Sequence, residues 1–505
     1  MTGDEFRRRA RDAAASGARR LVPLSREILF DGETPVSAFA KLRREGSPFA
    51  FLLESAPAGG ETWARYSFLG SAPRAVWRLT DGIVEDWTPE RGWHSARTPK
   101  DPLSDLEAIV ERYEPVDSPE DGEFWSGAVG FFSYDVVRLI ERLPHAPKKA
   151  VKAPDALFVF TGALVIIDNL RSQARIVVGV PIDPGMSEEQ ISVAHRSAGS
   201  EIDRTVGRLR AAGSLPAFDL DPDAPPASGV STYAAEKFKA DVQRIREYIV
   251  AGDAFQVLLA RRIEVPHDFS SEALYRSLRA INPSPYMYHL ILDGLELVGS
   301  SPELLVRVGA GKVTVRPIAG TRRRGRTVEE DEVMRAELLA DEKERAEHLM
   351  LVDLGRNDVG RIAKYGTVQV TDLMTAERYS HVHHMVSQVE GELRKGLSAM
   401  DAFRATFPAG TMTGAPKVRA MEIIDELEPE RRGPYAGAIG YIAAGGRRMD
   451  LAITIRTCVI AGGVASVQTG AGIVHDSVPE LEWKETENKA RAVLSAIGKA
   501  RKASP

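Results

Sequence analysis

Short apolar segments bounded by glycine and proline recur along this 505-residue chain, but they do not alternate regularly with helical segments. A parallel α/β sheet requires that alternation, so its absence favours an α+β fold with large, mostly antiparallel sheets flanked by helices. The expected strands lie near residues 48–55, 128–137, 156–168, 296–300, 312–318, 368–372, 436–442, 451–460 and 465–474. The expected helices lie near residues 233–251, 329–354, 398–405, 416–427 and 479–497.

A segment at 215–231 divides the chain into two strand-rich halves. Pro, Asp, Gly and Ser dominate it, which is typical of an exposed linker. A chain of this length exceeds one typical hydrophobic core, so we expect a composite of two domains. The first is expected at 20–214 and the second at 232–498.

Charge and cysteine content exclude several classes of protein. The formal net charge is −5, whereas general nucleic-acid binding usually needs a basic face. No run of about 18 apolar residues is available to span a membrane. The basic, alanine-rich N-terminus lacks the apolar middle of a secretory signal, which favours a surface helix. Cys458 is the only cysteine, so internal disulfides and cysteine-based zinc clusters are excluded. We expect a cytoplasmic protein with no nucleic-acid or membrane partner.

Two of the expected helices carry pairs of glutamates at a spacing of three residues. Glu344 and Glu347 form one pair, and Glu482 and Glu485 form the other, with Lys489 four residues further on. Residues three apart share a helix face, and such charged faces are usually solvated. If the two pairs face each other, four carboxylates create a site of hard oxygen ligands suited to Mg²⁺.

Three further features suggest that the chain holds an anion. The segment 468–474, QTGAGIV, follows an expected strand and is rich in small residues, which lets backbone N–H groups converge on a carboxylate or phosphate. A strand turn or bulge is the alternative interpretation. Arg456 lies inside an otherwise apolar strand, where a charge needs a partner. Gly320 and Thr321 offer a third anion-holding turn. Together they suggest a small substrate with more than one carboxylate.

Several motifs together resemble the chorismate-utilising enzymes. They are LLES at 52–55, PIAGT at 317–321, AEHLMLVDLGRND at 346–358, FPAGTMTGAPKVRAMEIIDELE at 407–428, YAGAIGY at 435–441, TIRT at 454–457 and QTGAGIVHDSVPELEWKETENKA at 468–490. The resemblance extends from about residue 20 to residue 497. It implies Mg²⁺-dependent amination of chorismate by ammonia, followed by elimination of pyruvate to give anthranilate. That reaction is the first committed step of tryptophan biosynthesis.

The resemblance also implies a set of site residues. Glu347 and Glu485 would bind Mg²⁺ directly, with Glu344 and Glu482 in support. The substrate-binding residues would be Gly320, Thr321, Tyr435, Arg456, Gly470, Ala471 and Gly472. The catalytic residues would be His381, Glu303 as general acid, Thr411 and Lys489. Only the resemblance selects His381 over the neighbouring His383 and His384.

Two positions favour ammonia as the nucleophile. Gln256 occupies the place where the water-using members of the family resemble one another in having a basic lysine. Ala319 stands where aminodeoxychorismate synthases have a lysine that attacks the ring, so covalent catalysis is closed here. The alternatives are a 2-amino-2-deoxyisochorismate synthase, an aminodeoxychorismate synthase component I or a non-catalytic binding protein.

The ammonia source is expected on a second chain. A glutaminase of the expected class needs a cysteine in a glycine-rich elbow, and Cys458 does not resemble one. The resemblance therefore implies a separate glutamine amidotransferase subunit, in a heterotetramer of two large and two small subunits.

Two motifs resemble the family's elements for inhibition by L-tryptophan, LLES at 52–55 and NPSPYMY at 282–288. By this resemblance Glu54 and Ser55 would meet the amino-acid head group, and Pro285, Tyr286 and Met287 would line the remainder. Ordinary strand and turn packing is the alternative interpretation.

Overall fold

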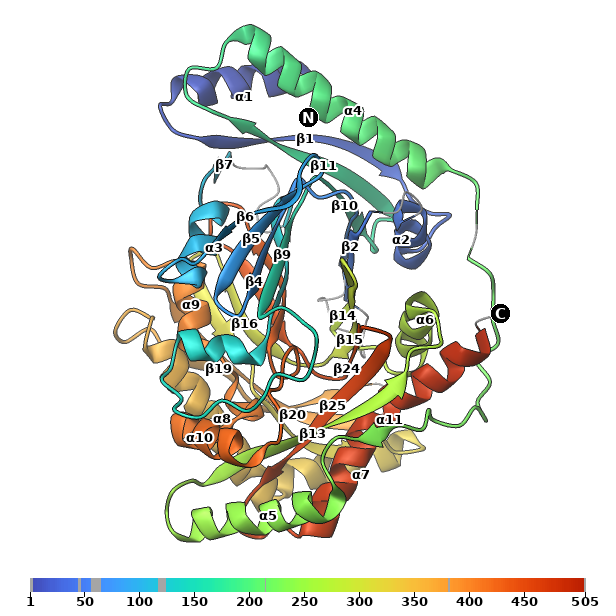
Figure 1. Ribbon diagram of the computed structural model, residues 1–505, viewed down its shortest axis with the longest axis vertical. Coiled ribbons are helices and arrows are strands. Elements are labelled where there is room, and N and C mark those ends of the chain that lie inside the picture. The colour runs from blue at the N-terminus through green and yellow to red at the C-terminus, as the bar shows by residue number, and fades with distance from the viewer. Residues whose placement is uncertain are drawn as a thin grey trace.

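The computed structural model describes residues 3–43, 47–55, 65–116, 124–213, 215–379 and 382–503. Two large β-sheets make up its centre, and helices pack on their outer surfaces (Figure 1). The expected α+β class with mostly antiparallel sheets is confirmed. No helix in the described part of the chain combines the length and apolar character that a membrane crossing needs.

The first sheet has 13 strands among the described residues. Their order is β12-β13-β25-β24-β15-β14-β2-β3-β10-β11-β1-β7, with β21 paired to β13. Only β1 and β7 pair in parallel. The bounds are β1 Arg20–Leu29, β2 Phe49–Glu54, β3 Tyr66–Gly70, β7 Glu114–Pro115, β10 Ala163–Asp168, β11 Gln173–Ile182, β12 Val230–Ser231, β13 Gln256–Pro266, β14 Tyr286–Leu292, β15 Leu295–Ser301, β21 Gly414–Ala415, β24 Thr457–Ala461 and β25 Val464–Ile473.

The second sheet has 12 strands among the described residues, all paired antiparallel. Their order is β18-β20-β17-β16-β23-β22-β8-β9-β4-β5-β6, with β19 paired to β20. The bounds are β4 Ala75–Thr80, β5 Ile83–Thr88, β6 Gly92–Arg97, β8 Gly127–Phe132, β9 Ala156–Phe160, β16 Leu304–Gly309, β17 Lys312–Val315, β18 Ile318–Arg323, β19 Gln369–Arg378, β20 Val382–Glu392, β22 Ala438–Ala443 and β23 Met449–Ile453.

Helices flank both sheets. α1 and α4 cover β1 and β11 at the top of Figure 1, and α11 packs beside α6 at the lower right. The bounds are α1 Gly3–Ala15, α2 Pro35–Arg43, α3 Pro102–Val110, α4 Glu188–Arg210, α5 Ala235–Val250, α6 Ser271–Ile281, α7 Val328–Ala340, α8 Glu342–Gly360, α9 Ala399–Thr406, α10 Lys417–Leu427 and α11 Pro479–Ala503, with 3₁₀ turns η2 Tyr134–Leu139 and η3 Gly410–Met412.

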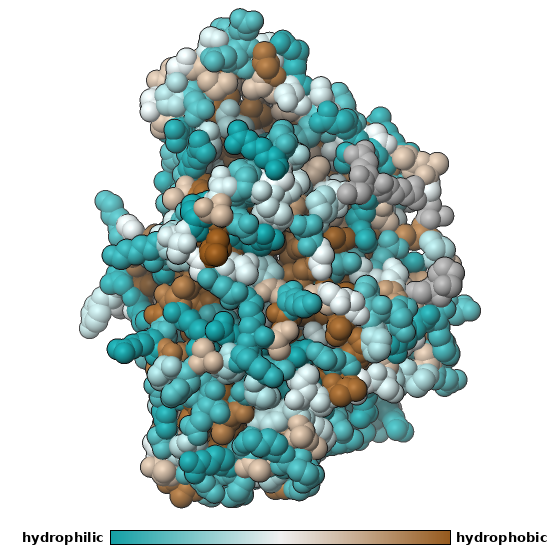
Figure 2. All heavy atoms as spheres, in the orientation of Figure 1, coloured by the Kyte–Doolittle hydropathy of each residue, from teal (hydrophilic) through white to brown (hydrophobic). Residues whose placement is uncertain are grey.

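Strand β2 illustrates why some strands of this fold are continuous apolar runs in the sequence. Phe49 and Phe51 face an apolar layer between the two sheets, whereas Ala50 and Leu52 face the helices outside the first sheet. Successive side chains of a strand point to opposite faces, so a strand covered on both sides needs apolar residues at every position. The surface is correspondingly polar: the face in Figure 2 is mostly hydrophilic, with its hydrophobic residues scattered.

Several expected elements are interrupted. The strands expected at 156–168 and 312–318 are each two strands, β9 with β10 and β17 with β18, and the one expected at 128–137 is β8 followed by η2. The helix expected at 329–354 is two helices, because Asp341 ends α7 and its side chain accepts hydrogen bonds from the N–H groups of Lys343 and Glu344 to begin α8. The strand expected at 451–460 is β23 and β24, separated at Arg456, which has a φ of +51°. Arg456 therefore lies in a connection between strands, not inside a strand.

The segment 215–231 has no helix or strand in its described residues before β12. It is anchored rather than fully exposed, since Ala224 and Ala227 are buried and the Ala227 N–H donates to the Leu494 carbonyl on α11. Both sheets take strands from either side of this segment. The boundaries at 20–214 and 232–498 stay a prediction.

Candidate active site

The glutamates of α8 and α11 lie close enough to influence one another. Burial raises the pKa of Glu347, and the carboxylates of Glu344 and Glu485 raise it further. Burial also raises the pKa of Glu482, with a further contribution from Glu485. The two glutamate pairs are distant in sequence, but together they form one region whose negative charges are not fully neutralised.

Protein groups contact all four of these carboxylates, and Glu482 is hydrogen-bonded by the Ser477 side chain. Gln256 Nε2 donates to Glu347 Oε1 at 3.3 Å, and Lys489 Nζ lies 2.5 Å from Glu485 Oε1. Arg322 Nη1 lies 3.3 Å from Glu344 Oε1. Within the described ranges, no group of three or more His, Cys, Asp and Glu side chains is arranged as a metal site. The chemistry of the donor set, four half-buried carboxylates with raised pKa values in two of them, nevertheless fits a hard divalent cation.

The turn at Gly320 lies against the first carboxylate helix. Gly320 has a φ of +66°, and a Cβ there would be 3.0 Å from Leu338 Cδ1 and 3.2 Å from Glu344 Oε2. A glycine at this position lets the β18 backbone approach Glu344 closely. Thr321, next to it, is exposed, with Oγ1 3.2 Å from His384 Nδ1.

His384 is the histidine that the structure places at this turn. Its Nδ1 lies 3.0 Å from the Gly320 carbonyl oxygen, which can only accept, so Nδ1 carries the proton and Nε2 is left as an acceptor. Burial lowers the pKa of His384 to about 4, and the nearby positive charges of Arg456 and Lys489 lower it as well. The ring is therefore neutral at pH 7.

The neighbouring histidines differ in position. His383 Nε2 lies 2.8 Å from Asp331 Oδ1 on α7, because consecutive strand residues point to opposite faces. His381 lies outside the described residues. Sequence reasoning did not single out His384; the signal that could have found it is the strand alternation at 382–387.

Glu303 and Arg456 lie on two connections that are hydrogen-bonded to each other. The Ile453 N–H donates to the Glu303 carbonyl at 3.0 Å, and the Ser300 N–H donates to the Arg456 carbonyl at 3.2 Å. Burial raises the pKa of the Glu303 carboxyl, whereas Arg456, a hydrogen bond from Thr411 Oγ1 at 3.2 Å and Lys489 lower it. Glu303 thus has the environment of a carboxylic acid that keeps its proton.

Arg456 has no ion pair with a carboxylate among the described residues. Burial lowers its guanidinium pKa, while the charges of Glu303, Tyr435 and Glu485 raise it. Tyr435 is 6% exposed and lies close enough to Arg456 to affect the pKa of its guanidinium. A largely buried guanidinium without a partner favours an anionic ligand.

The small-residue segment at 468–474 belongs to the expected strand up to Ile473 and does not form the anion-holding turn that the glycines suggested. Gly470, Ala471 and Gly472 belong to β25 and pair with Ala260, Leu259 and Leu258 of β13. The backbone of this segment is paired with β13 in the sheet. Its N–H groups therefore do not converge on an anion as they would in a turn.

The glycines of this strand make room for other side chains. A Cβ on Gly472 would lie 2.4 Å from Gln256 Nε2, and one on Gly470 would lie 3.1 Å from the Tyr435 hydroxyl. The Gly470 carbonyl accepts a hydrogen bond from Lys489 Nζ at 3.1 Å.

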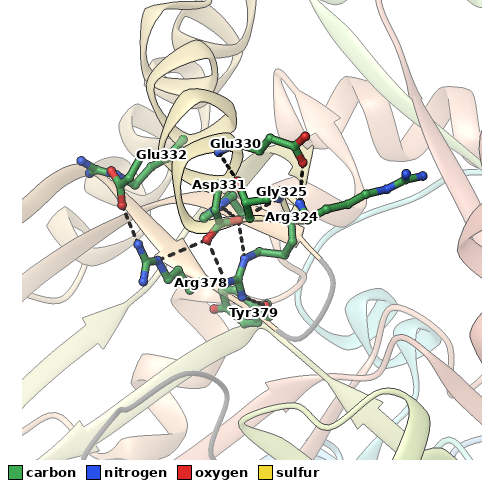
Figure 3. A network of polar contacts seen from close by, with 11 residues as sticks. Arg324, Gly325, Glu330, Asp331, Glu332, Arg378 and Tyr379 are labelled. Carbon is green, nitrogen blue, oxygen red and sulfur yellow. Dashed lines mark hydrogen bonds and ion pairs between the residues drawn. The ribbon is translucent and has the colours of Figure 1, made fainter.

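Two arginines of the basic run at 322–326, Arg322 and Arg324, pair with carboxylates. Arg324 donates two hydrogen bonds to Asp331, at 2.7 and 2.8 Å, and a third to the Tyr379 carbonyl (Figure 3). Arg378 reaches the same α7 carboxylates, Asp331 and Glu332. Hydrogen bonding to Arg324 lowers the pKa of Asp331. These contacts fasten β18 and β19 to α7, so Arg324 stabilises the turn instead of attracting a ligand.

The residues expected to bind an inhibitor line a separate cavity of about 400 Å³ between the two sheets. Glu54, Ser55, Pro285, Tyr286 and Met287 all line it, together with residues that the sequence did not single out: Arg65, Arg307, Gln388, Tyr441 and Asp450. The Glu54 carboxylate points to α6, where Tyr275 donates to it at 2.7 Å and Arg279 at 2.8 Å.

Comparisons with known proteins identify the class. The family model for chorismate binding enzyme matches residues 88–495. The chain belongs to this family and is an enzyme acting on chorismate.

Three individual relatives show which members of the family the chain resembles. The anthranilate synthase component 1 of Aquifex aeolicus is 48% identical over 94% of each chain. That of Pseudomonas putida is 46% identical over the whole of each chain. The crystal structure of anthranilate synthase component I from Streptococcus pneumoniae superposes with a TM-score of 0.74 at 36% identity, covering 92% of this chain and 99% of that one.

Proposed function

We propose that the protein is the large subunit of an anthranilate synthase, which aminates chorismate with ammonia and releases pyruvate. The observation that carries this proposal is the convergence at one place of Glu303, Arg456, His384 and the carboxylates of α8 and α11. The relatives named anthranilate synthase component 1 support it over nearly the full length. The enzyme would act in the cytoplasm.

Chorismate carries two carboxylates, and the site offers two kinds of partner for them. Glu347 and Glu485, supported by Glu344 and Glu482, would hold Mg²⁺, which supplies charge neutralisation and orientation of the ring carboxylate. Arg456, whose guanidinium has no carboxylate partner among the described residues, would bind the other carboxylate.

Tyr435, Lys489 and the β18 and β25 backbones would shape the remainder of the pocket. Gly320, Thr321, Gly470, Ala471 and Gly472 contribute small side chains there, so the ring can approach the main chain.

Glu303 would protonate the departing ring hydroxyl, since burial favours its neutral form, and Thr411 would keep the carboxyl oriented. A base is then needed for the ring proton that leaves as pyruvate is eliminated. His384 is neutral with a free Nε2, so we assign this role to His384, with His381 as the alternative from the sequence.

Gln256 and Ala319 support ammonia as the nucleophile. Gln256 places a neutral amide beside Glu347 and against Gly472, where no general base for water is then available. Ala319 precedes the Gly320 turn on β18 and has no nucleophilic atom.

The proposal also includes a partner subunit and an inhibitor. A separate glutamine amidotransferase subunit would supply the ammonia, in a heterotetramer of two large and two small subunits. L-Tryptophan would bind in the cavity lined by Ser55 and Met287.

The test supplies the isolated chain with chorismate, Mg²⁺ and an ammonium salt, and follows anthranilate by its fluorescence. We expect anthranilate to form with ammonium and not with glutamine alone. A stable non-aromatic product would instead indicate a 2-amino-2-deoxyisochorismate or aminodeoxychorismate synthase, and glutamine hydrolysis by this chain would refute the separate subunit.

His384→Ala and His381→Ala variants test the choice of base. We expect the first to consume chorismate while forming little anthranilate, and the second to form it nearly normally. The reverse pattern would assign the role to His381.

A further inference from the structure

A second cavity, of about 370 Å³, lies away from both the active site and the inhibitor cavity. Its lining comes from the connection between β3 and β4, the turn between β5 and β6, the first residue of β10, the C-terminal half of α4 and the end of α2. Figure 1 shows where α2 and α4 lie. Three arginines line the cavity: Arg74, Arg204 and Arg208.

Arg74 is the interior cation of this cavity. It is half-buried, and within the described residues its guanidinium makes no hydrogen bond or ion pair. Burial lowers its pKa, with Glu201 as the only opposing charge. A desolvated guanidinium without a close partner is costly, so an anion in the cavity would recover part of that cost.

The two acidic side chains that line the cavity, Glu90 and Glu201, do not serve as a close partner for Arg74. Glu201 Oε1 accepts the Ala163 N–H at 2.6 Å, an approach that the missing side chain of Gly162 permits, because a Cβ there would be 2.6 Å from the same oxygen. Glu90 is exposed on the turn between β5 and β6. The lining therefore carries one more positive than negative side chain, and Glu201 is committed to the backbone.

The rim adds further donors. Arg204 is exposed on α4 and has no ion pair in the described part of the chain, and Arg208, one turn further, lies 3.5 Å from Ser71 Oγ. The interior and the rim thus each present a guanidinium, which suits a ligand with at least two anionic groups.

We propose that this cavity is a binding site for a small polyanion, a metabolite with two or more phosphate or carboxylate groups. Arg74 binds the inner group, and Arg204 and Arg208 bind the outer one. The proposal is independent of the reaction catalysed, because the cavity shares no lining residue with the active site or the inhibitor cavity.

The experiment titrates the full-length chain with pyrophosphate and, separately, with citrate by calorimetry in Mg²⁺-free buffer, since both probes bind Mg²⁺. We expect saturable binding of at least one probe, and the stronger of the two indicates a phosphate or a carboxylate ligand. Hydrogen–deuterium exchange should slow at 71–74 and 201–208 when the probe binds. Absence of binding by both probes overturns the proposal.

Variants locate the site. We expect Arg74→Gln to weaken binding about tenfold or more, and Arg204→Gln about three- to fivefold, because the rim charge is exposed. Arg210→Gln, on the same helix but outside the lining, is the matched control and should bind normally. Equal affinity in all three variants places the anion elsewhere and overturns the proposal. Because Arg204 is exposed, Arg204→Gln should fold normally, and its affinity tests the proposal even if Arg74→Gln folds poorly.

Discussion

At the scale of single residues, burial determines which groups of the site are charged. Glu303 has a raised pKa and His384 a lowered one, so burial favours the acid form of the first, and the second is an unprotonated base at neutral pH. Two titratable groups whose environments move their pKa values in these directions are suited to general acid and general base roles.

Glu303→Gln should lower the turnover number about 10²- to 10⁴-fold, because the amide cannot donate a proton to the departing hydroxyl. As a general acid Glu303 is active when protonated, so the parent enzyme should lose activity as pH rises through the raised pKa. The variant should lack this dependence. Anthranilate fluorescence across pH measures both effects. Glu480→Gln, at an exposed position on α11, is the control, and an active Glu303→Gln enzyme would contradict the role.

Gly320→Ala should lower kcat/KM for chorismate about tenfold or more, because a side chain at a φ of +66° is strained and would crowd Leu338 and Glu344. The control is Gly311→Ala, which has a φ of +75° but no atom within 4 Å of the added Cβ. It carries the same backbone strain without the contact. Equal loss of activity in the two variants would show that strain alone is responsible.

At the scale of elements, the N-terminal halves of α8 and α11 bring like charges together. Glu347 is half-buried, and its pKa is raised first by burial and then by Glu344. A carboxylate with a raised folded-state pKa destabilises the folded chain when it is ionised. The proposed cation site would therefore lower the stability of the metal-free chain, a trade-off common at functional sites.

Glu347→Gln should raise the melting temperature of the metal-free protein at neutral pH, by about 2 °C, and abolish anthranilate formation. Because the folded-state pKa is raised, the gain should be absent below about pH 4, where the carboxylate is protonated in both states, and should grow as pH rises through the folded-state pKa. Thermal unfolding at a series of pH values measures it. The exposed Glu342→Gln is the control on the same helix, and a gain that is constant with pH would contradict this explanation.

At the scale of the whole molecule, β2 and α6 connect the cavity between the two sheets to the helix that carries Glu482 and Glu485. The Glu54 carboxylate at the end of β2 is bonded to Tyr275 and Arg279 of α6, and α6 packs against α11, which carries Glu482 and Glu485. A ligand that shifts β2 could thus move a carboxylate helix through packed elements.

Ser55→Arg and Met287→Thr should each remove inhibition by L-tryptophan while leaving ammonia-dependent activity within about twofold, because both residues line the cavity between the sheets and neither is among the proposed catalytic, substrate-binding or metal-binding residues. Activity titrated against L-tryptophan measures the loss. Ser197→Arg, at an exposed position on α4, is the control and should remain inhibited. Unchanged inhibition in both cavity variants would refute the placement.

The sequence by itself determined the α+β class, about half of the strands, the helical segments of α5 and α7 to α11, and the pairs of glutamates on α8 and α11, because hydrophobic periodicity and residue spacing are local signals. It could not determine that Asp341 divides one helical segment into two, since the capping hydrogen bonds depend on the backbone direction.

Only the tertiary structure decided which groups meet. The glycines at 470 and 472 were compatible with a strand and with an anion-holding turn, and pairing with β13 makes them part of a strand. His384 and His383 are equivalent in sequence until β20 turns one to Gly320 and the other to Asp331. Such contacts join residues far apart in the chain, and a pKa depends on them, so no local pattern contains the information.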